Sequence, residues 1–211
     1  MTRKSELHKR DTQYKRAKAE GYRARSAYKL LEIQKKFNIF KRAFYILDLG
    51  SAPGSWLQVA RKFAEENLEK YRDQHYYRDH FKIMGIDLKN ISPIEDVKTL
   101  RLDLCSEKVE QVINDFFPEN LDLILSDASI NKMGNAFTDQ LRQVKLCYRI
   151  LEIAKHGLKY KGVLLIKAFQ GTDFKSFVEK IKEGFFQVKI YKPKTSKKQS
   201  NEIYLIGLKK K

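Results

Sequence analysis

The sequence predicts an α/β fold in which a seven-stranded, mostly parallel β-sheet carries helices on both faces. From residue 43 onward, short apolar runs rich in β-forming residues alternate with segments of helical periodicity. No repeat, low-complexity block or Pro/Gly-rich linker interrupts this alternation, which is typical of a parallel sheet with crossover helices. The length of 211 residues allows one sizeable core, so we predict a single domain over residues 1–211.

Each predicted strand is a short apolar run bounded by polar or turn-forming residues. Between the strands, residues 138–158 place apolar side chains near helical spacing, and His156-Gly157 is a C-terminal stop signal for that helix. In chain order, the predicted strands are Ala43–Leu49, Lys82–Ile86, Val97–Leu102, Leu121–Ser126, Val163–Phe169, Phe186–Tyr191 and Glu202–Leu208.

The chain before the first strand is predicted to be a basic, helical N-terminal extension over residues 1–40, followed by a catalytic core over 41–211. The segment Asn67–Phe81 is too polar for a core element, so we interpret it as a surface excursion that lengthens the first crossover. His75 and His80 lie in that excursion and are expected to be exposed to solvent. No metal site is expected.

Composition excludes several classes of protein. With 42% hydrophobic and 12% aromatic residues, the chain is not disordered throughout. It contains no apolar run of roughly 18 residues, so we expect no transmembrane helix and no membrane partner. The charged N-terminus is not followed by an apolar run, which argues against a secretory signal. Cys105 and Cys147 have neither metal-ligand nor redox spacing, which indicates a reduced, cytoplasmic protein. We also expect a monomer.

The net charge of +17 is concentrated at the two ends of the chain. Residues 1–29 and residues 189–211 each carry a net charge of +7. Both ends interleave these charges with aromatic and aliphatic residues, which favours folded basic surfaces over solvated tails. Two basic surfaces on one domain indicate a polyanionic partner, with nucleic acid the first candidate.

Polar residues follow or end five consecutive predicted strands. Ligands of open parallel sheets bind at the carboxyl ends of the strands, near the point where strand order reverses. Any one of these residues could be an ordinary cap or turn residue, but five together predict a ligand site. In strand order they are the Asp48–Trp56 segment with its Gly50–Gly54 turn, then Asp87, Asp103, Asp127 and Lys167.

The glycine turn lacks the Gly-x-Gly-x-x-Gly pattern of dinucleotide sites and the Gly-x-x-x-x-Gly-Lys pattern of phosphate loops. An acidic residue before a tight turn suits a ligand with an ammonium and a sulfonium rather than phosphates. S-adenosylmethionine fits this description. Gly50 and Gly54 would allow close backbone approach, Asp48 would lie near the methionyl end, Asp87 would accept from the ribose hydroxyls and Asp103 from the adenine amine.

Five motifs in order resemble the FtsJ/RrmJ family of S-adenosylmethionine-dependent RNA ribose 2′-O-methyltransferases, over nearly the whole chain from about Lys9 to Leu208. They are Tyr22-Arg-Ala-Arg-Ser-Ala-Tyr-Lys29-Leu, Asp48-Leu-Gly-Ser-Ala-Pro-Gly-Ser-Trp-Leu-Gln58, Leu125-Ser-Asp127, Ile166-Lys167-Ala-Phe-Gln-Gly171 and Ser200-Asn-Glu202-Ile-Tyr. The resemblance implies a Rossmann-like class I methyltransferase fold. It also implies a catalytic tetrad at Lys29, Asp127, Lys167 and Glu202.

The predicted cofactor-binding residues combine the glycine turn, the strand-end carboxylates and the contacts implied by the resemblance. They are Asp48, Gly50, Ser51, Pro53, Gly54, Trp56, Asp87, Asp103 and Asp127. The chain departs from the family where Asp-Met-Ala-Pro-Asn is usual, because it has Asp127-Ala-Ser-Ile130-Asn131 instead. Ile130 does not supply the rigidity that a proline would give this loop.

The resemblance implies methylation of a uridine ribose in large-subunit rRNA, with the ribosomal subunit as partner and S-adenosylhomocysteine as product. A tRNA anticodon-loop ribose is the alternative target, and a non-catalytic RNA-binding ribosome-assembly factor is the alternative of another class.

Lys167 stands in an apolar strand, where a lysine is costly without a partner. We expect its ammonium to stabilise a developing alkoxide rather than act as a neutral base. Taken singly, Lys29 could be a phosphate contact, Glu202 a surface ion pair and Trp56 a packing residue.

Overall fold

A computed structural model of the protein describes residues 12–71, 78–131, 133–196 and 199–211. Its centre is a seven-stranded sheet in the order β3-β2-β1-β4-β5-β7-β6. Strands β1 to β5 are parallel, and β7 runs antiparallel to both β5 and β6. The strands are β1 Tyr45–Leu49, β2 Lys82–Asp87, β3 Val97–Arg101, β4 Leu121–Ser126, β5 Leu158–Phe169, β6 Phe185–Tyr191 and β7 Glu202–Lys210.

Every predicted strand is present, and most bounds move by only one or two residues. The main difference is that β5 begins at Leu158 rather than Val163. Leu158 pairs with Leu121 of β4, and the register then shifts before Leu123 pairs with Val163. An irregularity of this kind hides the first part of the strand from a search for continuous apolar runs.

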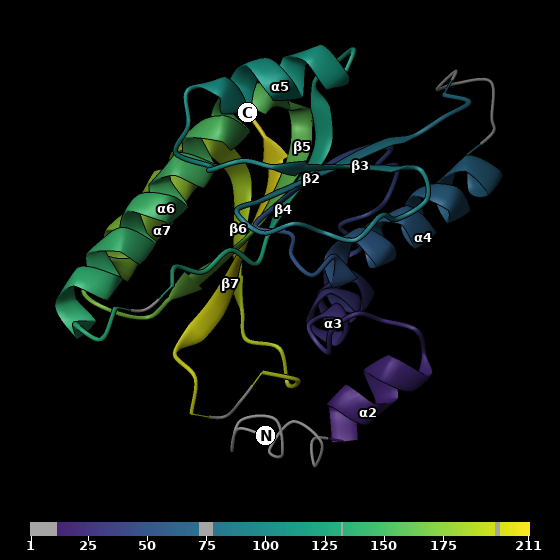
Figure 1. Cartoon of the computed structure of the whole chain (residues 1–211). Helices are drawn as coiled ribbons and strands as arrows, with labels where there is room; N and C mark the ends of the chain where they lie inside the picture. The colour runs from purple at the N-terminus through teal and green to yellow at the C-terminus, as the bar shows by residue number, and fades with distance from the viewer. Residues whose placement is uncertain (1–11, 72–77, 132, 197–198) are drawn as a thin grey trace.

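Helices cover both faces of the sheet, as predicted (Figure 1). Helices α5, α6 and α7 pack on one face and contribute Val109, Ile150 and Phe177 to one hydrophobic core. Helices α3 and α4 pack on the other face, where Leu30 and Leu57 belong to a second core. The helices are α2 Thr12–Ala19, α3 Ala27–Phe37, α4 Ser55–Lys70, α5 Lys108–Phe116, α6 Ala136–Gly157 and α7 Phe174–Gly184. Among the described residues, no helix has the length and apolar character needed to cross a membrane.

The interpretation of Asn67–Phe81 as one surface excursion is wrong at its start, because α4 continues to Lys70. Asn67 is buried, and its side-chain amide donates to the carbonyls of Phe40 and Ala43 at 2.7 and 3.0 Å. Burial of a polar side chain is tolerated here because these two bonds satisfy it. His80 contacts Asp79 and Tyr45, whereas His75 lies outside the described residues.

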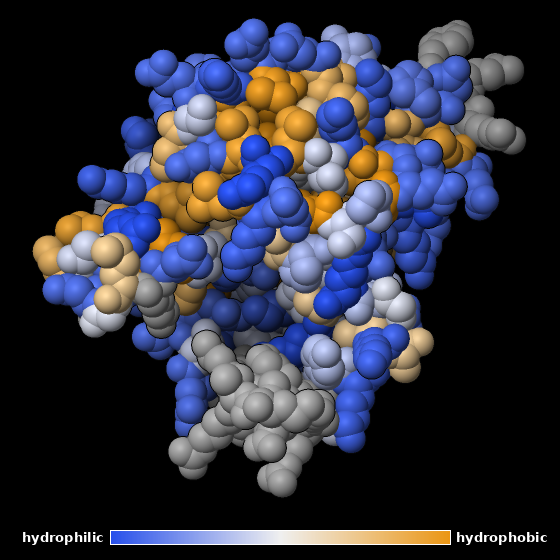
Figure 2. All heavy atoms as spheres, in the orientation of Figure 1, coloured by the Kyte–Doolittle hydropathy of each residue, from blue (hydrophilic) through white to orange (hydrophobic). Residues whose placement is uncertain are grey.

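The strand order reverses at β1, which has β2 on one side and β4 on the other. A reversal of this kind opens a crevice at the carboxyl ends of the two central strands. Figure 2 shows that the lower part of the molecule, below the sheet in Figure 1, is hollowed and mostly hydrophilic on its visible walls. The predicted site residues on β1, β2, β4 and β5, or directly after these strands, lie at the carboxyl ends of the strands.

Candidate active site

Lys167 and Asp127 form an ion pair at the carboxyl ends of β5 and β4. The Lys167 side chain is 8% exposed, and its Nζ lies 3.0 Å from Asp127 Oδ1. The same nitrogen donates to the Asp127 backbone carbonyl at 2.6 Å. Parallel pairing of β4 with β5 positions the two residues, because Asp127 directly follows Ser126, whose register partner is Ile166. The buried lysine therefore has the carboxylate partner that its place in an apolar strand requires.

Tyr204 of β7 completes this arrangement and was not predicted. It is the register partner of Lys167 across the antiparallel pair, is fully buried, and donates its hydroxyl to Asp127 Oδ1 at 2.7 Å. Burial and the neighbouring Asp127 raise the pKa of Tyr204 well above 10, so the phenol stays a donor. A signal existed in the sequence, since residues 202 and 204 of a strand share one face.

Lys29 and Glu202 form a second ion pair beside the first, joining α3 to the start of β7. Lys29 Nζ lies 5.8 Å from the centre of the Tyr204 ring, and the Ser196 hydroxyl donates to Glu202 at 3.1 Å. Burial alone would raise the pKa of Glu202, but hydrogen bonding and charge from Lys29, with Lys167 and Ser196, lower it below its ordinary value. The structure thus brings all four tetrad residues together, around one tyrosine.

The glycine turn after β1 lies against the loop after β4. Gly50 has a φ of +77°, and a Cβ added to it would stand 2.5 Å from the Ala128 Cβ. Gly54 has a φ of +103°, and a Cβ there would meet the Arg23 guanidinium at 2.9 Å. Larger residues are therefore excluded at both positions. The turn and the tetrad share one edge of the sheet.

Arg23 fastens this turn to the rest of the fold, although it was not among the predicted residues. Its guanidinium donates to the carbonyls of Pro53, Ser92 and Pro93 at 3.2, 2.7 and 2.7 Å. A planar group with several fixed donors suits three acceptors from two different loops.

Asp48 is fully buried in β1, and neither of its carboxylate oxygens has a hydrogen-bond partner in the described part of the chain. Ser51, 4% exposed, also has a buried hydroxyl oxygen without a partner there. Burial, reinforced by the negative charges of Asp127 and Asp87, raises the pKa of Asp48 well above its ordinary value. An uncompensated carboxyl beside a turn that admits no side chain fits a ligand that carries positive charge.

The other two strand-end carboxylates already accept hydrogen bonds from backbone N–H groups. Asp87 accepts from the backbone N–H of Ala52 at 2.9 Å and of Lys89 at 2.8 Å. Asp103 is exposed and accepts from the Cys105 N–H at 2.9 Å. Each carboxylate oxygen can accept more than one bond, so both residues retain acceptor capacity for a ligand.

The structure places the Trp56 side chain in the core rather than in the crevice. It is 2% exposed, its indole N–H donates to the Ser26 carbonyl at 2.9 Å, and its ring lies 5.9 Å from that of Tyr204. Its backbone N–H, in the first turn of α4, has no acceptor within the helix. Any contact of this residue with the cofactor would therefore come from its backbone.

The loop after Asp127 is held without the family's proline. The backbone N–H of Ile130, which a proline would lack, donates to the buried Gln143 side chain of α6 at 3.0 Å. The amide nitrogen of Gln143 donates in turn to the Ala128 carbonyl at 3.3 Å. Gln143 thus fixes by hydrogen bonds a loop that proline would stiffen through its ring.

Helix α3, which follows the basic N-terminal segment, meets the basic C-terminal segment at this site. Glu32 of α3 accepts from the Tyr191 hydroxyl at 2.6 Å and from the Lys194 N–H at 2.8 Å. Lys36 Nζ lies 4.2 Å from the centre of the Tyr191 ring. The tetrad is therefore flanked by α3 on one side and by the segment between β6 and β7 on the other.

Comparison with known proteins identifies the chain. Residues 22–210 match the model of the FtsJ-like methyltransferase family. The chain belongs to this family. It is 39% identical to ribosomal RNA large subunit methyltransferase E of Methanosarcina acetivorans over 202 residues, covering 95% of this chain and 69% of that protein. It is 38% identical to the enzyme of the same name from Rickettsia felis, covering 93% of this chain and 83% of that one.

A Plasmodium falciparum chain assigned as a ribosomal RNA methyltransferase superposes with a TM-score of 0.74 at 27% identity, covering 90% of this chain and 98% of that one. Membership of the FtsJ-like family confirms the predicted methyltransferase, its Rossmann-like fold and S-adenosylmethionine as its cofactor. The roles of the individual site residues stay predictions.

Proposed function

We propose that this protein transfers the methyl group of S-adenosylmethionine to a ribose 2′-hydroxyl of RNA, most specifically of a uridine in large-subunit rRNA. The observation that carries the proposal is the contact of Lys167 with Asp127, surrounded by Tyr204 and the Lys29–Glu202 pair. The names of the relatives from Methanosarcina acetivorans and Rickettsia felis support rRNA over tRNA as the substrate.

The cofactor supplies an electrophilic methyl group on a positively charged sulfur. The fit at Asp48, Gly50 and Gly54 supports its binding at the glycine turn, beside Asp127. Methyl transfer forms a carbon–oxygen bond as the carbon–sulfur bond breaks, and the hydroxyl proton is released to solvent. The protein has to hold the ribose oxygen in line with that bond, and orientation alone can supply up to roughly 7–11 kcal/mol of such a barrier.

Lys167 is proposed to face the ribose oxygen. An ammonium has three donors and no acceptor, and two of the three have oxygen acceptors on Asp127, the carboxylate and the backbone carbonyl. The third donor is then available for the ribose oxygen as it gains negative charge. This supports electrostatic stabilisation by Lys167 over proton abstraction. A rate that rises with deprotonation of this lysine would contradict it.

The two basic ends are proposed to hold the RNA backbone on either side of the site. Lys35 and Lys36 belong to α3, and Lys192 and Lys194 belong to the segment after β6 that Glu32 joins to this helix. Contacts with phosphates give affinity, and the requirement for a 2′-hydroxyl gives the choice of RNA over DNA. We extend the proposal to one catalytic domain over residues 1–211 that acts as a cytoplasmic monomer.

The test offers radiolabelled S-adenosylmethionine to large ribosomal subunits and to bulk tRNA in parallel, and then maps the labelled ribose. We expect label on a uridine ribose of the large subunit. Label confined to tRNA would transfer the proposal to the alternative substrate.

Asp127→Ala and Lys167→Met separate catalysis from binding. We expect Lys167→Met to abolish transfer while cofactor binding, followed by calorimetry, persists. Full biological effect of Asp127→Ala would instead favour a non-catalytic role in ribosome assembly.

A further inference from the structure

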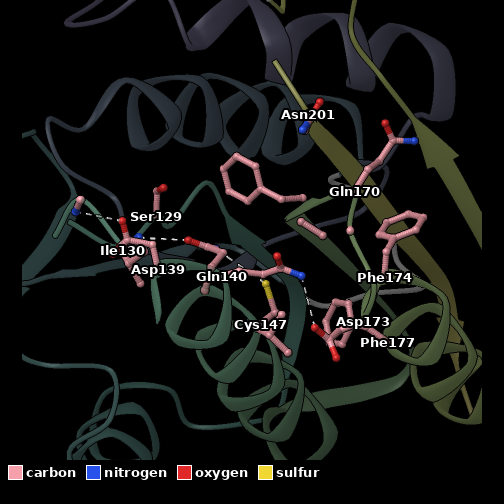
Figure 3. A pocket seen from close by; sticks show the side chains of 16 residues that line it. Ser129, Ile130, Asp139, Gln140, Cys147, Gln170, Asp173, Phe174, Phe177 and Asn201 are labelled. Atoms are coloured by element: carbon pink, nitrogen blue, oxygen red, sulfur yellow. Dashed lines mark hydrogen bonds between the residues drawn. The ribbon is translucent and has the colours of Figure 1, made fainter. Parts of the chain in front are cut away.

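A pocket of about 410 Å³ adjoins the Lys167–Asp127 pair and is not used by the chemistry above (Figure 3). It lies between α6, the end of β5 and the start of α7. Ser129 and Ile130 in its wall follow Asp127 by two and three residues, and Ala168 directly follows Lys167. Its volume is within the range of roughly 300–1,000 Å³ that is typical of small-ligand sites.

We propose that this pocket binds the nucleobase of the nucleotide whose ribose is methylated. The inference rests on the proposed function and specifies how the target nucleotide is held. Phe169 connects the two sites, because its ring lines the pocket while its centre lies 6.0 Å from Lys167 Nζ. A base stacked on Phe169 would therefore leave its own ribose near the Lys167 ammonium.

The lining is rich in aromatic side chains. Phe169, Phe174 and Phe177 contribute three rings, and Cys147 Sγ points toward the pocket from α6 (Figure 3). Burial raises the pKa of the Cys147 thiol to about 11, although the Gln143 hydrogen bond and the charge of Lys167 oppose this shift. The thiol is thus neutral near pH 7. Flat, neutral surfaces of this kind stack on nucleobases.

Charge distinguishes a base from a phosphate as the occupant. The 16 lining residues, all described, include Asp139 and Asp173 but no lysine or arginine. In a chain with a net charge of +17, this lining repels phosphate while the surrounding surfaces attract it. The backbone of the RNA would lie outside on the basic surfaces, and only a base would enter.

Several polar groups of the pocket are already committed to structure. Gln143 holds Ala128 and Ile130, and Asp139 accepts from the backbone N–H of Met133. The side-chain amides of Gln170 and Asn201, in contrast, have no hydrogen-bond partner among the described residues. Amides can both donate to and accept from the edge of a base. These two residues are therefore the candidates for reading its identity.

The experiment combines Phe169→Ala with abasic RNA. The substrate is a large-subunit rRNA fragment that carries the mapped ribose, prepared intact and with the base removed at the target or at either neighbouring nucleotide. Phe186→Ala is the matched control, because Phe186 is 59% exposed on β6 and lies outside the pocket lining. Asn201→Ala provides an exposed second variant that leaves the core intact.

Loss of stacking is expected to lower kcat/KM of Phe169→Ala on intact RNA by about 5- to 150-fold. Removal of the target base should lower kcat/KM of the wild type by a similar factor. It should change kcat/KM of Phe169→Ala by less than about twofold, because the effects of removing two groups that contact each other are not additive. Asn201→Ala should also lose kcat/KM non-additively with removal of the target base, by a smaller factor. Phe186→Ala should have the kcat/KM of the wild type on every RNA.

Additive losses, or coupling only at a neighbouring nucleotide, would overturn the assignment while leaving ribose methylation intact. Failure to methylate any RNA ribose despite cofactor binding would instead remove the proposed function, and the base pocket with it.

Discussion

Tyr204→Phe tests whether the buried tyrosine orients the reacting groups or only fills space. The substitution removes one oxygen, the donor to Asp127 Oδ1 at 2.7 Å, and leaves the ring against Trp56. Hydrogen bonds to charged groups contribute about 1.5–3 kcal/mol to stability. Tyr204 is fully buried but the Asp127 side chain is 20% exposed, so water can replace part of the lost contact and we expect a loss near the lower end of that range. For a chain of this size, each kcal/mol corresponds to roughly 2–4 °C in Tm.

The catalytic expectation is a fall in kcat of about tenfold at saturating substrates, or about 1.4 kcal/mol of activation free energy. Asp127 would keep its ion pair with Lys167 but lose the contact that fixes the position of its carboxylate. The assay is single-turnover methyl transfer at a temperature well below the Tm of the variant, with KM for RNA measured in parallel.

Tyr45→Phe is the control for this experiment. Tyr45 is also buried, and its hydroxyl lies 3.1 Å from His80 Nε2, at the opposite end of β1 from the glycine turn. This variant should lose stability without losing kcat. If Tyr204→Phe likewise lowers Tm while kcat stays within twofold of the wild type, the reasoning is refuted and Tyr204 only supports packing.

Three further predictions concern charge. Asp48→Asn should raise the Tm of the cofactor-free protein at pH 7 and weaken cofactor binding. The pKa of Asp48 is raised in the folded protein, so the wild type loses stability as the pH rises through this folded-state pKa, and asparagine does not. Thermal unfolding at several pH values and calorimetry of cofactor binding check this, and a lower Tm of the variant would contradict it. For Glu202 the sign is opposite: its lowered pKa gives stability above the ordinary value of 4.5 that is lost as pH falls through the folded value. On acidification, the free energy of unfolding measured in urea should therefore decline less steeply for Glu202→Gln than for the wild type. Equal declines in the two proteins would be evidence against the buried Lys29–Glu202 pair. Finally, KM for RNA should rise steeply with salt while the Kd for S-adenosylmethionine changes little; a flat KM between low and physiological ionic strength would count against the basic surfaces.

The sheet could be predicted closely because its buried parallel strands are continuous apolar runs, and their order along the chain places their carboxyl ends on one edge. The resemblance then supplied the four tetrad positions, which the structure brings together. Features that depend on cross-strand register were missed. The contact of Tyr204 with Asp127 arises from the pairing of β7 with β5, and a single sequence does not reveal that pairing.

Two other differences have local causes. Asn67 was assigned to the surface from its polarity, but the carbonyls of Phe40 and Ala43, in the segment before β1, satisfy it inside the core. Ile130 was expected to leave its loop without the proline's rigidity, yet its N–H finds Gln143, a partner 13 positions further along the chain. In both cases hydrogen bonding between distant segments decided the outcome, and composition and periodicity carry no information about such partners.

The antiparallel return of β7 has a consequence for synthesis on the ribosome. Lys29 and Glu202 are separated by 173 positions, and β7 is inserted between β5 and β6 in the sheet. A nascent chain that has reached β6 already contains the glycine turn, Asp127 and Lys167, yet lacks both the tyrosine and the glutamate that surround them. The proposed transfer site is therefore completed only when the last strand has been synthesised.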